Sequence, residues 1–399
     1  MKRSILDQDI QTFINKNIEK PISETALAGP LFGSDWHEVL IQIESKLKSK
    51  SKLPTWFSSP GVYFPSKIAI EQTSSEKTAA YKATLVSGES LIDLSGGFGV
   101  DSYYFSKKIS RVVHCEQDEL LAQIVSHNSH ILKSDNIKHY NLDSYDVLKN
   151  LNQHFDWIYV DPSRRNDIKG KVFLMEDCLP NVPKNLDFYF NYTNNILIKT
   201  APLLDLSAGI KVLQNVKSIH IIAVENEVKE ILWQLEKEYC KEINIRTVNI
   251  EKTKNTVFNF IYSKYNSNKE YKLPQKFLFE PNAAIMKSGG FDQVMLQYDV
   301  FKLHKHTHLY TSNQALDFPG RVFEIELVLD YNKINMKQFL ENKTANITTR
   351  NFTETVSSIR KKWKIGEGGS QYCFFATDAN NKKIVLICKK KSNDENQIL

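Results

Sequence analysis

The sequence predicts an α/β fold: a parallel sheet with crossover helices, preceded by a helical region and followed by a small α+β module. Three observations lead to this prediction. Between residues 91 and 263, short apolar runs alternate with helix-length segments, as in parallel sheets with crossovers. The first run breaks into a glycine-rich turn. After a polar stretch with a proline at 267–276, longer strand-like runs such as RVFEIELVL surround the helix-like NFTETVSSIRKKW.

Taken in order, the elements begin with residues 1–50, which are polar and helix-like, with apolar positions such as Ile10 and Ile14. One amphipathic helix is expected over ENEVKEILWQLEKEY, with Glu225 and Glu227 in its first turn, where acids suit the helix dipole. The expected strands are the apolar runs LIDL, RVVHC, IKHY, DWIYV, NILIKT, SIHIIAV and VFNFIY.

Composition is that of a soluble globular protein, with 41% hydrophobic and 25% charged residues. We expect no membrane span, since no run approaches ~18 apolar residues, and no signal peptide. Five scattered cysteines without a CxxC pair argue against disulfides and zinc, and favour a cytoplasmic location. Residues 331–399 hold thirteen Lys/Arg against six Asp/Glu, so the positive charge gathers where a polyanion could bind.

The glycine-rich turn follows the first apolar run as D-L-S-G-G-F-G. Asp93 ends the strand, and the small residues after it let the backbone approach a ligand closely. A dinucleotide fingerprint would place a third glycine at 102, where this chain has Ser102. Asp93 would repel a pyrophosphate, so a ligand with a cationic amino acid and a ribose fits better. The residues expected to contact it are Asp93, Ser95, Gly96, Gly97 and Gly99.

Two acids follow the next two strands. Glu116 stands 23 residues after Asp93, the separation at which such folds hold ribose hydroxyls. Asp143 could receive an adenine amino group, although a helix N-cap explains it nearly as well. The fourth strand ends in Asp161 and Pro162, which places a carboxylate and a rigid carbonyl at the ligand-binding edge of the sheet.

Together, D-L-S-G-G-F-G, the acid Glu116 and D-P-S-R resemble the class I S-adenosylmethionine-dependent methyltransferases. The resemblance implies a Rossmann-like, seven-stranded sheet and S-adenosylmethionine as the cofactor. D-P-S-R is similar to the D/N-P-P-Y/F/W signature of enzymes that methylate nitrogens of nucleobases, which implies catalytic roles for Asp161, Pro162, Ser163 and Arg164. Here Ser163 replaces the second proline and Arg164 replaces the aromatic residue.

EQTSSEKTAAYKA before the first strand resembles the branch with the RNA cap guanine-N2 methyltransferases, and the C-terminus resembles THUMP-like domains. Since THUMP domains bind RNA, the resemblance implies an RNA partner, tRNA or rRNA. The alternative for the basic segment is a solvated helix face with Trp363 in the core. The RNA-binding candidates are Arg350, Arg360, Lys361, Lys362 and Lys364.

The expected organisation has four parts: an N-terminal helical region (1–85), a methyltransferase domain (86–266), a small ferredoxin-like or connecting region (275–321) and a THUMP-like domain (322–392). The expected function is methylation of a nucleobase nitrogen in RNA. Two alternatives stay open: a small-molecule methyltransferase with the C-terminal module as a lid, and a non-catalytic RNA-binding protein with a vestigial cofactor pocket.

Three further features have ordinary explanations. Cys178 is expected to be a buried structural thiol rather than a nucleophile. Lys199 is either a solvated lysine or a phosphate contact. His304, His306 and His308 alternate as on one strand face, and without acidic or thiol companions they predict surface histidines rather than a metal site. The sequence does not indicate the oligomeric state.

Overall fold

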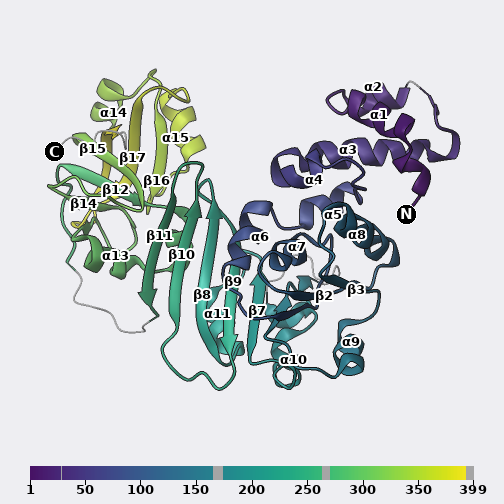
Figure 1. Ribbon diagram of the computed structural model, residues 1–399. Coiled ribbons are helices and arrows are strands. Elements are labelled where there is room, and N and C mark those ends of the chain that lie inside the picture. Colours follow the sequence, from purple (N-terminus) through teal and green to yellow (C-terminus); the bar gives the residue numbers. More distant parts are fainter. Residues whose placement is uncertain (28, 165–173, 263–269, 392–399) are drawn as a thin grey trace. The chain divides into compact units, whose positions relative to one another are not determined.

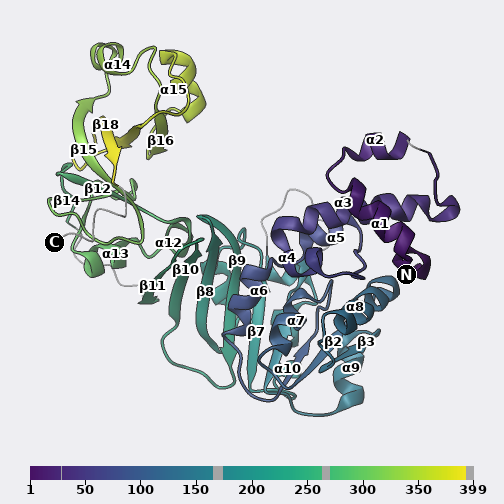
Figure 2. The same ribbon diagram turned by 45° about the horizontal axis from the view of Figure 1, so that its top comes forward.

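The computed structural model describes residues 1–27, 29–164, 174–262 and 270–391. They divide into two compact units, shown in Figures 1 and 2. Unit 1 holds the described residues of Met1–His220 and Lys229–Ile243, and unit 2 those of Ile221–Val228 and Asn244–Leu399. In the described part of the chain, no helix combines the length and the apolar character that a membrane crossing needs.

Unit 1 begins with helices that pack on the helices of its sheet. Figures 1 and 2 show α5 (Lys67–Gln72) beside α8 (Glu119–Ile131). Isoleucines and aromatic rings of the first 70 residues form one apolar cluster with Val100 and Ile124, so burial of this face holds the region in place. The elements are α1 (Gln8–Asn17), α2 (Ile22–Leu27), α3 (Trp36–Lys52), α4 (Pro54–Ser58), α5 (Lys67–Gln72) and α6 (Glu76–Ala83), with 3₁₀ turns at Arg3–Leu6 and Gly33–Asp35.

Seven strands follow one another in the order β3-β2-β1-β4-β7-β9-β8 within a nine-stranded sheet of the described residues. The first five of these strands are parallel, and β9 runs antiparallel to β7. The sequence-based prediction of a Rossmann-like α/β sheet is confirmed, but the described part of the sheet has nine strands instead of the predicted seven. The strands are β1 (Ser90–Asp93), β2 (Arg111–Cys115), β3 (Ile137–Tyr140), β4 (Trp157–Val160), β7 (Asn195–Thr200), β8 (Val216–Val224) and β9 (Glu227–Glu236).

Helices connect the parallel strands, and a short ladder follows β4. The helices are α7 (Val100–Ser106), α8 (Glu119–Ile131), α9 (Ser144–Leu151), α10 (Val182–Tyr189) and α11 (Leu206–Val212). Strands β5 (Ser163–Arg164) and β6 (Cys178–Leu179) pair antiparallel, with a 3₁₀ turn at Met175–Asp177. The Cys178 side chain is buried.

The helix predicted over ENEVKEILWQLEKEY is wrong, because this segment forms strand β9. Glu225 and Asn226 have φ of +49° and +64°, and they make the tight turn between β8 and β9 instead of beginning a helix. Four consecutive residues from Glu230 to Trp233 are buried, as expected for a strand covered on both faces. Pairing and burial in the sheet thus determine the secondary structure of this segment, although its apolar residues have a helical spacing.

Unit 2 contains the antiparallel pair β10 (Asn244–Ile250) and β11 (Asn255–Ile261) and a second sheet of order β13-β14-β12-β15-β18-β17-β16. The predicted small C-terminal α+β module is confirmed. Its elements are β12 (Phe277–Pro281), α12 (Ala283–Ser288), α13 (Phe291–Tyr298), β13 (Phe301–Lys302), β14 (Tyr310–Ser312), β15 (Gly320–Asp330), α14 (Lys333–Phe339), β16 (Asn346–Arg350), α15 (Val356–Trp363), β17 (Gln371–Thr377) and β18 (Lys383–Lys390).

The three alternating histidines do not lie on a strand face. They occupy the connection between β13 and β14, where His308 has a φ of +51° and stacks on Phe291 at 3.7 Å between ring centroids. Within the described residues, no group of three or more His, Cys, Asp or Glu side chains is arranged to hold a metal ion.

A buried ion cluster connects α6 to the sheet. The Lys82 ammonium, with no exposed side-chain surface, lies 3.0 Å from Asp101 Oδ1 and 2.9 Å from Glu230 Oε2, and it donates to Ser74 Oγ. Burial lowers the pKa of Lys82, but the two carboxylates outweigh burial and the net shift is upward. Since Asp101 follows the glycine turn and Glu230 lies on β9, one lysine fixes three elements together.

We predict that Lys82→Met destabilises unit 1 by about 3–5 kcal/mol, because two buried carboxylates lose their counterion. Chemical denaturation followed by circular dichroism measures the change, with the exposed Lys108→Met as control. Equal denaturation midpoints for the two variants would contradict the ion cluster's role.

Candidate active site

The glycine turn leaves β1 in a backbone conformation that only glycine adopts easily. Gly96, Gly97 and Gly99 have φ of +31°, +61° and +75°. A Cβ on Gly96 would lie 2.3 Å from the carbonyl oxygen of Cys115, and one on Gly99 would lie 2.6 Å from Val125. The turn is therefore packed tightly against β2 and α8, and its sequence tolerates no side chain at these two positions.

The Asp93 side chain stabilises the glycine turn through hydrogen bonds. Its Oδ1 accepts hydrogen bonds from the Ser95 and Gly96 backbone N–H groups at 3.0 and 3.1 Å, and from Ser95 Oγ at 3.0 Å. Its Oδ2 accepts from Ser102 Oγ at 2.7 Å. Burial raises the pKa of Asp93 to about 7, although the hydrogen bonds from Ser102 and Ser95 oppose the shift. Both oxygens of the Asp93 side chain are thus used in hydrogen bonds to the turn and to Ser102.

Ser102 takes the place of the third fingerprint glycine and performs a bonding role that sequence reasoning missed. Its hydroxyl joins Asp93 to Nδ1 of the buried His114, 3.0 Å away on β2. Burial, with a smaller contribution from His139, lowers the pKa of His114 to about 3, so this imidazole is neutral. A histidine within the otherwise apolar run RVVHC was the available signal.

Glu116 lies directly beside the turn. Its Oε2 accepts from the Gly97 N–H and its Oε1 from the Asp118 N–H, each at 2.8 Å. Asp143 is instead the N-cap of α9, where it accepts from the Tyr145 N–H at 2.8 Å and from the Gln117 side chain. The structure brings Glu116 to the glycine turn, and it shows Asp143 in the capping position that the sequence left open.

The fourth-strand motif is tied to the turn by a single hydroxyl. Ser95 Oγ accepts from the Asp161 backbone N–H at 2.7 Å while donating to Asp93. Pro162 is buried, and Ser163 is exposed and pairs with Leu179 of β6. Arg164 pairs through its backbone with Cys178, and its side chain lies outside the described part of the structure.

Lys199, near the end of β7, pairs with the Asp161 carboxylate, a partner that the sequence did not indicate. Its Nζ lies 2.6 Å from Asp161 Oδ2, and the two side chains are only 15% and 29% exposed. Burial lowers the pKa of Lys199, but Asp161 and Glu230 outweigh it and raise the pKa well above its usual range. Lys199 therefore stays charged beside Oδ2 of Asp161.

The RNA-binding candidates of the C-terminal module separate into two groups. Arg350 pairs with Glu280 at 2.8 Å, Lys362 pairs with Glu354 at 3.1 Å, and Arg360 donates to the backbone carbonyls of Ala345 and Gly366. Trp363 is buried and bonds Tyr331, as in the solvated-helix alternative. Lys361 and Lys364 remain exposed.

Comparison with known proteins identifies the C-terminal domains. Models of a ferredoxin-like domain and of a THUMP domain-like family match residues 277–319 and 320–390. No curated protein matches the chain.

Among solved structures, the "putative methyltransferase from Porphyromonas gingivalis W83" is similar over 98% of this chain and 99% of its own, at 27% identity and a TM-score of 0.86. Two structures match less of the chain. An O-methyltransferase from Bacillus cereus in complex with SAH covers 41% of this chain and 83% of its own, at 14% identity and a TM-score of 0.33. An rRNA methylase from Streptococcus thermophilus covers 40% and 94%, at 13% identity and a TM-score of 0.30.

The strand order, the glycine turn and the full-length structural match define the fold of a class I methyltransferase. The chain carries this fold together with a C-terminal THUMP-like domain, as the motifs of the sequence indicated.

The raised pKa of Asp93 predicts a pH dependence of stability. The folded protein keeps this proton up to about pH 7, whereas an unfolded chain releases it near 3.8. The stability contributed by the protonated group is therefore complete below the lower value and lost as the pH rises through the upper one. The non-titrating Asp93→Asn variant should lack this component.

The measurement is the unfolding free energy of wild type minus that of Asp93→Asn across this range, with the exposed Asp187→Asn as control. The difference should fall as the pH rises. A pH-independent difference would show that Asp93 ionises as freely in the folded state as in the unfolded chain.

Proposed function

We propose that the protein is an S-adenosylmethionine-dependent methyltransferase that modifies a nucleobase nitrogen in RNA, tRNA or rRNA, in the cytoplasm. The observation that carries the proposal is the Ser95 hydroxyl, which joins the glycine turn to the backbone of Asp161. This bond joins the turn that we assign to the cofactor and the motif that we assign to the amine, at one edge of the sheet. The full-length likeness to the putative methyltransferase from Porphyromonas gingivalis supports the methyltransferase part of the proposal.

The residues at the turn fit the cofactor. Positive φ angles at Gly96, Gly97 and Gly99 open the backbone toward a ligand, and Glu116 offers carboxylate oxygens for ribose hydroxyls. The Glu116 carboxylate does not suit a pyrophosphate, whereas a ribose is compatible with it. When bound, the cofactor supplies an electrophilic methyl group on a sulfonium.

Asp161 and Pro162 would orient the nucleophile. An exocyclic amine attacks best when its N–H groups are held and its lone pair points at the methyl carbon, so positioning dominates this reaction. Oδ1 of Asp161 and the Pro162 carbonyl are the acceptors for those N–H groups. The Lys199 ammonium, 2.6 Å from Oδ2, holds the Asp161 carboxylate in one orientation. Ser163 and Arg164 follow at the substrate side of the motif.

RNA is the proposed substrate because the catalytic fold is joined to a THUMP-like domain and to the basic end of the chain. Labelled methyl groups traced from S-adenosylmethionine into total RNA of a deletion strain, followed by nucleoside analysis, test this directly. A methylated nucleobase in RNA is expected. Label confined to small molecules, or no transfer at all, would favour the lid or the vestigial alternative.

We predict that Glu116→Ala weakens cofactor binding by about 1–3 kcal/mol, because ribose hydroxyls and the Gly97 N–H lose a charged acceptor. Calorimetry with S-adenosylhomocysteine measures the change, and Glu119→Ala on the exposed start of α8 is the matched control. Equal affinities for the two variants would remove Glu116 from the cofactor site.

We predict that Asp161→Ala abolishes turnover and leaves cofactor affinity within a few-fold of wild type. The bond from Ser95 to residue 161 uses the backbone N–H, so the glycine turn survives the substitution. Methyl-transfer kinetics and calorimetry are compared with the exposed Asp187→Ala. Parallel losses of binding and turnover would assign Asp161 to the cofactor instead of the substrate.

A further inference from the structure

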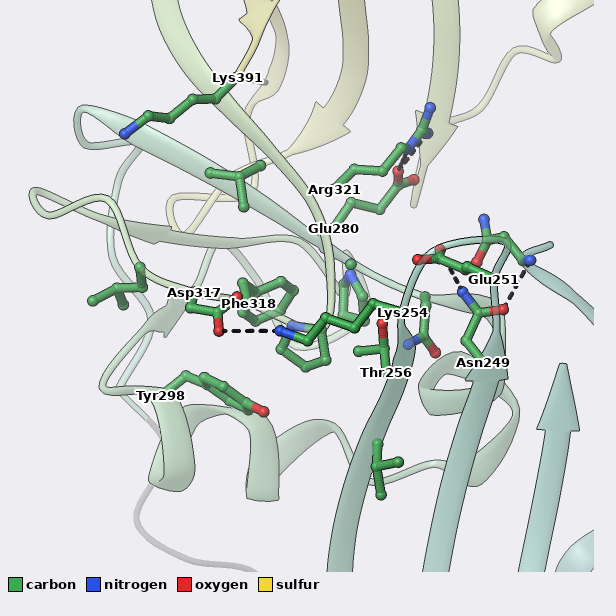
Figure 3. Close-up of a pocket in the computed structure, with 18 of the residues that line it drawn as sticks. Asn249, Glu251, Lys254, Thr256, Glu280, Tyr298, Asp317, Phe318, Arg321 and Lys391 are labelled. Carbon is green, nitrogen blue, oxygen red and sulfur yellow. Dashed lines mark hydrogen bonds and ion pairs between the residues drawn. The ribbon is translucent and has the colours of Figure 1, made fainter. Parts of the chain in front are cut away.

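Unit 2 contains a groove of about 640 Å³ that the proposed catalytic site does not use (Figure 3). One wall is the turn between β10 and β11, and the other is formed by the loop 315–319 and the start of β15. Lys390 and Lys391, at the end of β18, complete the rim. All of these segments belong to unit 2, so the groove is a feature of one compact body.

Cations outnumber free carboxylates along the groove. Four basic side chains line it: Lys254, Arg321, Lys390 and Lys391. Of the three acids, Glu251 accepts a hydrogen bond from the Asn249 side chain at 2.8 Å. Glu280 is only 4% exposed and is already bonded by both Arg321 and Arg350, at 2.6 and 2.8 Å.

The other pairings are weak or missing. Asp317 lies 3.9 Å from the Lys254 ammonium, with both side chains mostly exposed, so this pair contributes little. Lys390 and Lys391 form no ion pair with any residue between 1 and 391 that the structure describes. The rim therefore offers positive charge to an anion.

Neutral groups with unused hydrogen-bonding capacity lie between these cations. The side chains of Thr253, Asn255 and Thr256 make no hydrogen bond to other described residues. Two aromatic rings, Tyr298 and the largely buried Phe318, line the opposite side, with 5.3 Å between ring centroids. Amides and hydroxyls bond base edges, while lysines bond phosphates, so the lining combines both needs of a nucleic acid ligand.

We infer that this groove binds a single-stranded segment of RNA, with phosphates on the Lys254, Lys390 and Lys391 rim and bases against the neutral wall. Single strands are favoured because base edges and faces are accessible only when unpaired. The inference rests on the proposed RNA substrate and assigns binding of that RNA to unit 2. It also moves the RNA contact away from α15, whose Arg360 and Trp363 serve the domain's own packing.

The test compares two triple variants that remove the same charge. K254Q/K390Q/K391Q neutralises the groove rim, and K337Q/K361Q/K364Q neutralises three exposed lysines on and beside α14 and α15. Binding of a short fluorescein-labelled single-stranded RNA of mixed sequence is measured by anisotropy at several salt concentrations, with a duplex of the same sequence in parallel. Melting curves establish that both variants are folded.

The groove variant should bind single-stranded RNA about tenfold or more weakly, and its slope of log affinity against log salt should be shallower by about 2, since each lost phosphate contact removes about 0.7. The α14–α15 variant should match wild type. The inference is overturned if the groove variant retains wild-type affinity, if the α14–α15 variant shows the loss instead, or if duplex binds as tightly as single strand.

This outcome is separable from that of the proposed function. If the groove variant still binds and methylates RNA like wild type, the groove assignment fails while the RNA methyltransferase proposal stands. If wild type transfers no methyl group to RNA but loses RNA binding in the groove variant, the groove assignment stands and the proposed reaction fails.

Discussion

The hydroxyl of Ser95 is the contact on which the candidate site depends. It donates to the Asp93 carboxylate and accepts from the Asp161 backbone N–H, so it needs both a proton and a lone pair at one short side chain. Strands β1 and β4 are neighbours, and the Leu94 N–H continues their pairing to the Tyr159 carbonyl. The end of one strand and the motif after the other thus behave as one rigid edge.

Charge arranged beneath this edge fixes its parts in position. Lys82 joins Asp101, just after the glycine turn, to Glu230 on β9, and Glu230 in turn supports the charged state of Lys199 beside Asp161. Each carboxylate has a cation, and each cation is held by more than one group. Burying such a network costs desolvation free energy. In exchange, the network fixes the positions of its side chains, because each of them can satisfy its partners in one arrangement only. Reactions that depend on alignment benefit from that rigidity.

The sequence allowed the strand-turn-helix at 91–105 and the Asp161 motif to be placed because both follow directly on buried strands, whose carboxyl ends share one edge. It failed where tertiary contacts decide the outcome. The segment of β9 has the apolar spacing of an amphipathic helix, yet its Glu230 is the buried partner of Lys82. Lys199 and Ser102 gave no local signal of their partners, which come from distant segments. Arg360 looked like an RNA contact, but backbone carbonyls of its own domain hold it.

The most direct test of the central claim is calorimetry of the purified chain with S-adenosylhomocysteine and, separately, with NAD. The geometry at Gly96, Gly97 and Glu116 predicts one-to-one binding of S-adenosylhomocysteine, tighter than any binding of NAD. Tighter binding of NAD, or no binding of S-adenosylhomocysteine, would contradict the assignment of this turn to a methyl donor.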